Sequence, residues 1–299
     1  MTVINTNIAS MQAADASNSA AKMTAQAMQR LSTGMQINSA ADNAAGLAIV
    51  NTMTSQIDGM QQSVANANDG VSLAQTAGGA LTEVTNMLQR IRQLAVQSSS
   101  GTYETSDRQA MQTEVTNLTQ QISGILTSTT FNGVNVFAIT SGAPAANGSQ
   151  DVTFTIQTGA NNGENVLIDS PAFNGSTLFG TSGGAGLTSF SSASGVTPAM
   201  DVSNQTVAAS TITNVDAVLQ AVNANQSSLG AAQNRLTAVV NNLNTNITNL
   251  SSARSRIQDT DYSTETTNLA KAQILSQAST AMIAQANQSQ QNVLSLLKG

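Results

Sequence analysis

The feature that most constrains the fold is residues 44–99, in which apolar residues recur at alternating intervals of three and four. This spacing is typical of a coiled-coil seam, where one face of a helix is covered by a partner helix. A helix of this length would measure about 80 Å at about 1.5 Å per residue. Ser39 and Asp42 have the spacing of a capping box and predict its start. The seam positions are Leu47, Val50, Met53, Ile57, Met60, Val64, Ala67, Val71, Ala74, Leu81, Val84, Leu88, Ile91 and Ala95.

Two further segments predict helices that complete a bundle with the first. One opens at Ser106, with Gln109 in the reciprocal capping position, and continues with apolar residues at helical spacing. The other, residues 229–257, repeats the spacing of three and four. The pair Gly78 and Gly79 is a weak point of the long helix, because each glycine costs roughly 1 kcal/mol relative to alanine. The predicted core therefore joins residues from both halves of the chain.

The middle of the sequence predicts a small β region. Residues 131–134 carry an Asn-Gly turn signal, and apolar residues alternate over residues 152–156 before a glycine-bounded turn and residues 166–168. Residues 170–200 contain no charged residue and are dominated by Gly, Ser and Thr. We interpret this last stretch as an exposed loop or a minimal outer extension.

Composition argues against several classes of function. Charged residues are 9% of the chain, against about 25% in an ordinary domain, and the formal net charge is −6, so clustered basic residues for a nucleic acid are missing. The absence of His and Cys removes the commonest general base, metal ligands and thiol nucleophile. We therefore expect no catalytic residues, no metal and no cofactor. A weakly charged, polar surface suits a protein that packs against many copies of itself.

The start of the sequence and its hydropathy bear on export. The first residues lack the basic start, apolar run and cleavage pattern of a secretory signal, and no run of 18 apolar residues exists to span a bilayer. We expect either a cytoplasmic protein or one exported without a cleaved signal peptide.

Both ends predict long helices with broad apolar cover, which need more than one partner. In the N-terminal one, Ala20 and Ala27 share a helical stripe with Met11 and Met23. A pair formed by the two ends alone would leave one face bare. We therefore predict that the terminal helices drive polymerisation of the chain with copies of itself. The residues expected to carry this contact are Ile4, Ile8, Met11, Met23, Leu31, Leu275, Met282, Val293 and Leu297.

Motifs at both ends, in order, resemble those of bacterial flagellin. Near the N-terminus they are VINTN (3–7), RLSTG (30–34), INSA (37–40), DNAAG (42–46), NANDG (66–70) and FNG (131–133). Near the C-terminus they are KAQIL (271–275), AQAN (284–287) and NVLSLL (292–297). The resemblance covers roughly residues 1–170 and 205–299.

The resemblance implies a mainly α, elongated helical bundle with long coiled-coil-like terminal helices and a small β-hairpin region. Residues 1–42 with 256–299 would form the inner-tube domain. Residues 43–170 with 205–255 would form the bundle domain with its β region, and residues 171–204 a short variable outer segment.

The resemblance also implies a function and partners. The chain would be a structural subunit that polymerises into the extracellular filament of the bacterial flagellum and supports swimming motility. It would be exported unfolded by the flagellar type III apparatus, held beforehand by an export chaperone, and assembled beneath a filament cap beyond the hook-associated proteins.

A further implied partner is a vertebrate Toll-like receptor. The segment QRIRQLAV, residues 89–96, matches the contact region of flagellins that this receptor recognises, with Gln89, Arg90, Leu94 and Glu114 at matching positions. Gln93 replaces the usual Glu and removes a charge. The same residues could instead pack against neighbouring subunits, and Arg90 and Arg92 could also be solvated helix charges near Glu83.

A charged cluster, a methionine stripe and the function itself each have an alternative interpretation. Arg254, Arg256, Asp259 and Asp261 are expected to serve a helix end and linker rather than metal or acid chemistry. The stripe of Met53, Met60 and Met87 is expected to fill the core. The alternative functions are a hook–filament junction protein and a cell-surface receptor built on a flagellin-like architecture.

Overall fold

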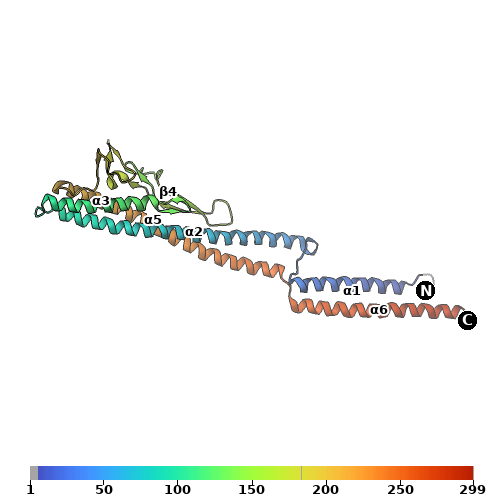
Figure 1. Ribbon diagram of the computed structural model, residues 1–299. Coiled ribbons are helices and arrows are strands. Elements are labelled where there is room, and N and C mark those ends of the chain that lie inside the picture. The colour runs from blue at the N-terminus through green and yellow to red at the C-terminus, as the bar shows by residue number, and fades with distance from the viewer. Residues whose placement is uncertain (1–5, 183, 299) are drawn as a thin grey trace. The chain divides into compact units, whose positions relative to one another are not determined.

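The computed structural model describes residues 6–182 and 184–298, and the side chains among them up to residue 292. The chain divides into two compact units, one formed by residues up to 57 together with those from 247, the other by residues 58–246. The fold is mainly α, with long terminal helices and a small β region, as the sequence predicts (Figure 1). The helices are α1 (Ile8–Thr33), α2 (Ala40–Ser98), α3 (Thr105–Ser128), α4 (Gly175–Leu178), α5 (Gln205–Gln258) and α6 (Tyr262–Lys298).

The β region consists of short strands that all lie between α3 and α5 in the sequence. They are β1 (Thr130–Phe131), β2 (Val134–Asn135), β3 (Ile139–Thr140), β4 (Val152–Gln157), β5 (Asn165–Ser170), β6 (Phe173–Asn174), β7 (Thr181–Ser182), β8 (Ala185–Gly186) and β9 (Val196–Thr197). The β1–β2 and β4–β5 pairs are antiparallel hairpins, and β3 pairs with β6 in parallel. The remaining sheet has the order β8-β7-β9. The alternating residues 152–156 therefore form the predicted hairpin, with Phe154 opposite Ile168.

The core of the larger unit joins α2, α3, α5 and the β region. Several seam positions of α2, among them Leu81, Leu88 and Ile91, are fully buried in one core with residues such as Ile122 of α3 and Leu236 of α5. Met60 is buried and Met87 packs against this core, as predicted, whereas Met53 is only half-buried and lies outside this core. The heptad spacing thus identified the buried face of the bundle correctly.

Two predicted helix starts can be compared with the structure. Asp42 accepts hydrogen bonds from the backbone and hydroxyl of Ser39, which confirms the predicted contact, and these bonds lower the pKa of the Asp42 carboxyl. The prediction of Ser106 and Gln109 as the cap of α3 is wrong. The helix begins one residue earlier, and the carboxylate of Asp107 accepts from the backbone N–H of Glu104 at 3.1 Å.

The interpretation of residues 170–200 as an exposed loop or minimal outer extension is wrong for residues 170–180, whereas none of the described residues among 181–199 is buried. Phe173, Leu178 and Phe179 are at most 3% exposed and belong to the core of the larger unit. Few apolar residues anchor this segment, and they are separated by Gly, Ser and Thr, so no periodic pattern revealed them.

The segment after β9 returns between α3 and α5 and is held by helix side chains rather than by a neighbouring strand. Gln112 of α3 accepts from the backbone N–H of Val202 at 2.6 Å and donates to the carbonyl of Met200 at 3.4 Å. Thr211 of α5 bonds both the N–H and the carbonyl of Asp201. These side chains satisfy backbone groups that would otherwise be buried without partners.

Candidate assembly surface

The terminal helices α1 and α6 pair side by side in antiparallel directions through small residues (Figure 1). The buried residues of α6 recur every seven residues as Glu265, Ala272, Ser279 and Ala286. The buried residues of α1 are Ala20 and Ala27, again seven apart. Because Ala and Ser lack bulk, the two backbones approach closely, and larger side chains are left outside this seam.

Polar contacts at each end of the pair fix the register of the two helices. Asn7 caps α1 by accepting from the N–H of Ser10, and its amide donates to the carbonyl of Ala286 at 3.1 Å. At the opposite end Arg30 lies 3.8 Å from the carboxylate of Glu265, whose side chain is only 8% exposed. Each contact joins residues at opposite ends of the sequence, so both ends of the chain are needed to build the pair.

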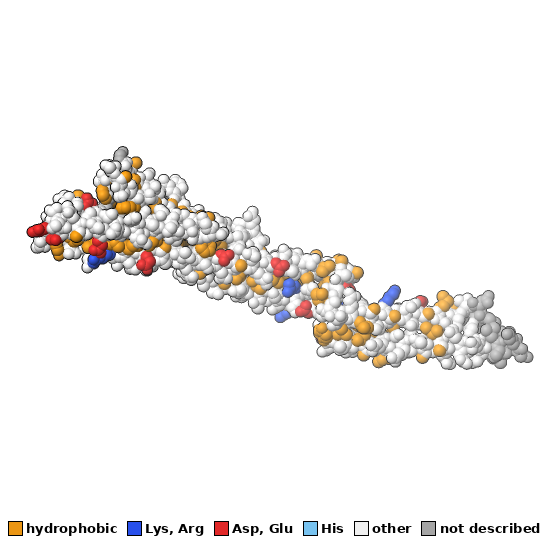
Figure 2. Space-filling model, in the orientation of Figure 1, with side chains coloured by type: hydrophobic (Ala, Val, Ile, Leu, Met, Phe, Trp, Pro, Cys, Tyr) orange, Lys and Arg blue, Asp and Glu red, His pale blue; other side chains and the backbone are white. Residues whose placement is uncertain are grey.

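Large apolar side chains remain exposed on the outside of this pair, although the rest of the molecule buries most of its own. Ile274 is 65% exposed, Met282 61%, Met11 60% and Ile8 55%. Figure 2 shows apolar side chains on the visible surface of this helix pair, where charged side chains are few. We call the large non-aromatic apolar residues that are exposed in the described parts of α1 and α6 the assembly surface. They are Ile8, Met11, Met23, Met28, Ile274, Leu275 and Met282.

Most residues predicted to carry polymerisation lie on the assembly surface. Ile8, Met11, Met23, Leu275 and Met282 do so, whereas Leu31 is half-buried. Ile4 and the side chains of Val293 and Leu297 lie outside the described residues.

Two features of this helix pair differ from the sequence analysis. Ala20 and Ala27 were assigned to the same stripe as Met11 and Met23, but the structure buries the alanines and exposes the methionines. Sequence reasoning also missed Met28, which is 57% exposed and lies off that stripe. A hydropathy stripe does not separate small from large apolar residues, and here size decides which face packs inside the subunit.

The segments that join the terminal helices to their neighbours contact each other directly. The N–H of Gln36 donates to the carbonyl of Gln258 at 2.6 Å, and that of Thr260 to the carbonyl of Gly34 at 2.9 Å. Gly34 ends α1 with φ of 72°, a left-handed conformation that favours glycine.

The charged cluster near this junction has the expected structural role. Asp261 accepts from the N–H of Ser263 and the hydroxyl of Thr264 at the start of α6, and the hydroxyl bond is the main cause of its lowered pKa. Arg254 donates to the hydroxyl of Thr54 at 3.3 Å. Within the described residues no group of three or more acidic or metal-ligating side chains forms a metal site.

The two basic residues of α2 form ion pairs with neighbouring helices. Arg90 donates to Glu114 of α3 and to Gln93, each at 2.7 Å, and Arg92 donates to Asp216 of α5 at 2.7 Å. These bonds raise the pKa of both arginines, and all four charged side chains are 44–46% exposed. The ion-pair partners of these arginines are therefore Glu114 of α3 and Asp216 of α5 rather than the nearby Glu83 of α2.

The predicted receptor segment is split between surface and core. Gln89, Arg90 and Glu114 lie at the surface or partly exposed, whereas Leu94 is 2% exposed and packs in the core. Leu94 therefore supports this surface from beneath.

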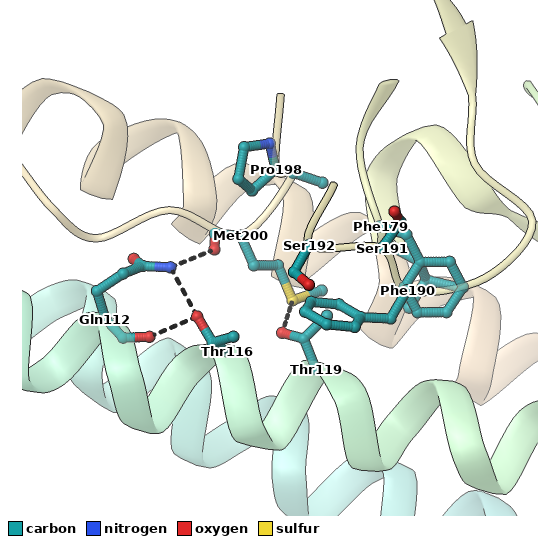
Figure 3. A pocket seen from close by; sticks show the side chains of 11 residues that line it. Gln112, Thr116, Thr119, Phe179, Phe190, Ser191, Ser192, Pro198 and Met200 are labelled. Carbon is teal, nitrogen blue, oxygen red and sulfur yellow. Dashed lines mark hydrogen bonds between the residues drawn. The ribbon is translucent and has the colours of Figure 1, made fainter. Parts of the chain in front are cut away.

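A small pocket of about 140 Å³ lies between α3 and the β region (Figure 3). Phe179 and Phe190 line one side, and Gln112, Thr119 and Met200 line another. The hydroxyl of Thr119 points at the sulfur of Met200 at 3.7 Å. The side chains of Gln112, Thr116 and Thr119 are already hydrogen-bonded within the protein, and Gln112 holds residues 200–202 in place.

No helix in the described part of the chain combines the length and hydropathy needed to cross a bilayer.

Comparison with known proteins gives a consistent family. Residues 4–141 match the bacterial flagellin N-terminal helical region, and residues 212–297 match the bacterial flagellin C-terminal helical region. A flagellin of Xenorhabdus nematophila is 40% identical over 99% of both chains. Flagellin B of Vibrio cholerae is 36% identical over 98% of this chain and 99% of its own.

Among solved structures, the crystal structure of Bacillus cereus flagellin aligns with a TM-score of 0.43 and 24% identity, over 60% of this chain and 88% of that one. The assignment rests on the sequence relatives, which match nearly the full length of this chain. The chain belongs to the bacterial flagellin family, and is a structural subunit of the flagellar filament rather than an enzyme.

Proposed function

We propose that copies of this subunit join through the assembly surface of α1 and α6. The observation that carries the proposal is that this helix pair buries alanine and serine inside and leaves Ile274, Met282 and Met11 more than half exposed. Covering a large aliphatic side chain completely is worth about 1.5–3 kcal/mol. A second copy is the partner that fits, because the family builds a homopolymer and few charges on this pair oppose contact between identical surfaces.

The seam within one subunit adds little stability of its own. Burying an alanine methyl contributes about 0.8 kcal/mol, whereas ordering each residue costs about 1–2 kcal/mol. The pair therefore gains much of its stability when neighbouring subunits cover it. Val293 and Leu297 would add to this contact near the end of α6, and Ile4 before the start of α1.

A marginally stable helix pair also suits export. We propose that the subunit travels unfolded through the flagellar type III apparatus without a cleaved signal peptide, and that an export chaperone covers the apolar side chains of α6 beforehand. Leu275 and Met282 are exposed in the described subunit and offer such a chaperone an apolar face. Folding would follow beneath the filament cap, beyond the hook-associated proteins, and the rotating polymer would support swimming motility.

The division into an inner-tube domain of residues 1–42 with 256–299, a bundle domain of residues 43–170 with 205–255, and a variable outer segment of residues 171–204 stays a prediction. The two compact units of the structure divide near residues 57 and 247 instead, and the contact between residues 34–36 and 258–260 lies within the smaller unit.

The Toll-like receptor contact likewise stays a proposal. Its exposed part would be Gln89, Arg90 and Glu114, while buried Leu94 would only position them. Since Gln93 accepts a hydrogen bond from Arg90, one donor of that guanidinium is already engaged. A reporter-cell titration with monomer and with the variant E114A tests this. If neither the original monomer nor E114A gives a response, the receptor proposal is refuted. Packing between subunits is then the remaining role for these residues.

Seeded assembly tests the main proposal. Purified chain and a version lacking residues 264–299 are added to filament fragments, and products are examined by negative-stain electron microscopy. We expect filaments from the full chain and none from the truncation. Filaments from the truncated chain would refute assembly through the terminal pair. Growth of the full chain only on a different filament protein would favour a junction protein.

A further inference from the structure

Methionine is the residue of this chain most readily oxidised. The sequence contains no Cys and no Trp, but 11 Met. The methionine thioether is converted reversibly to the sulfoxide, which is a polar group. Which methionines react first depends on how exposed their side chains are.

Exposure divides the described methionines sharply by location. Met11, Met23, Met28 and Met282 are 60%, 44%, 57% and 61% exposed, and all four lie on the assembly surface. In the bundle, Met60, Met111 and Met200 are at most 8% exposed. The remaining described methionines, Met35, Met53 and Met87, are half-buried.

We propose that Met11, Met23, Met28 and Met282 form a redox-modification site that controls assembly of the subunit. The reactant is a two-electron oxygen donor such as hydrogen peroxide. The sulfur lone pair attacks one peroxide oxygen, an S–O bond forms and the O–O bond breaks. The departing hydroxide takes up the proton carried by the transferred oxygen and leaves as water, so the thioether is oxidised by two electrons and the peroxide is reduced.

The effect on assembly follows from where the new oxygen lies. A sulfoxide in the free subunit faces water, but in a subunit contact it would be buried among apolar side chains without a built hydrogen-bond donor. Four such groups per subunit would recur at every contact in a polymer. The effect on assembly rests on the proposed function, whereas the order of oxidation rests on exposure alone.

The polymer should in turn protect the same sulfurs. If neighbouring subunits cover the assembly surface, peroxide reaches these four methionines more slowly in filaments than in monomers. Oxidation would then act on subunits before assembly, and a methionine sulfoxide reductase would restore them.

Two parts of the proposal can be tested, the order in which the methionines oxidise and the effect of oxidation on assembly. Monomer is treated with peroxide and then analysed by peptide mass mapping and by seeded assembly. The samples are untreated chain, treated chain, treated chain repaired with reductases for both sulfoxide epimers, preformed filaments treated in the same way, and the variant M60L/M111L/M200L. This variant removes buried thioethers outside the assembly surface.

We expect the four exposed methionines to oxidise first, seeded assembly to fall by about tenfold or more, and the reductases to restore it. Oxidation should reduce seeded assembly of M60L/M111L/M200L as much as it reduces assembly of the original chain. Early oxidation of Met60, Met111 or Met200, normal assembly of fully oxidised monomer, or resistance of the variant would each overturn the inference. Failure of untreated chain to assemble would instead refute the proposed function, and the mapping would still decide the order of oxidation.

Discussion

Two glycines inside α2, Gly70 and Gly79, should respond differently to replacement by alanine. Gly79 is exposed, and a Cβ added there would meet no atom within 4 Å. Gly70 is buried beneath the β4–β5 hairpin, and a Cβ there would lie 3.0 Å from Cδ1 of Leu236 and 3.1 Å from Cγ1 of Ile156. The two positions therefore share a backbone conformation but not an environment.

The magnitudes follow from two opposing terms. Replacing an exposed helical glycine by alanine stabilises by about 0.5–1 kcal/mol, because alanine loses less conformational freedom on folding. At Gly70 the same gain is opposed by overpacking, which typically costs about 1–3 kcal/mol when a methyl group enters a filled core. Carbon atoms pack best at about 3.5–4.0 Å, so the hairpin or Leu236 must shift. We expect G79A to be more stable than G70A by about 1–3 kcal/mol.

Urea unfolding followed by far-UV circular dichroism measures this difference, with both variants and the original chain at the same protein concentration. G79A should raise the unfolding midpoint, and G70A should leave it unchanged or lower it. A midpoint for G70A equal to or above that of G79A would refute the close packing of the hairpin against α2.

Two other predictions concern buried polar groups. Q112L should lower the free energy of unfolding by about 1–3 kcal/mol, because it leaves backbone groups of Met200 and Val202 unpaired. The control Q120L, on the exposed face of α3, should change the free energy of unfolding by less than about 0.5 kcal/mol. Equal effects of the two variants in urea unfolding would contradict the contacts of Gln112 with residues 200–202. Asp169 has one shielded carboxylate oxygen without a partner, and burial, then the charge of Asp151, raises its pKa. The folded state thus holds this proton more tightly than the unfolded state, so its contribution to stability falls as pH rises from the ordinary aspartate pKa of about 3.9 to the raised value. D169N should therefore raise the thermal midpoint at neutral pH and lose this advantage in acid, and a gain that is the same at every pH would contradict the assignment.

The sequence predicted the bundle because its apolar spacing is physically decisive. A helix with apolar residues at intervals of three and four has one face to cover, and Leu81, Leu88 and Ile91 cover it as expected. The β4–β5 hairpin was equally predictable from the sequence, because the alternating apolar residues 152–156 are followed by a turn between two glycines. Both signals are periodic and local.

The parts that could not be predicted depend on contacts between distant residues. Phe173 and Phe179 anchor a Gly-rich and Ser-rich segment whose neighbours give no period. The pairing of Arg92 with Asp216 joins residues from opposite halves of the chain, which charge spacing within one helix does not reveal. The division of the terminal pair into an alanine seam and a methionine exterior depends on how closely two backbones approach, and a list of apolar positions does not contain that distance.

The most direct measurement of the central claim is the critical concentration for seeded assembly of I274Q/M282Q, against Q277A/Q285A as a matched control on the same helix. Ile274 and Met282 are 65% and 61% exposed, so covering each is worth about 1–2 kcal/mol, and losing both should raise the critical concentration roughly 30-fold or more. The control removes only exposed polar side chains and should assemble as the original chain does. Equal critical concentrations for I274Q/M282Q and the original chain would contradict assembly through the exposed apolar face of the terminal helices.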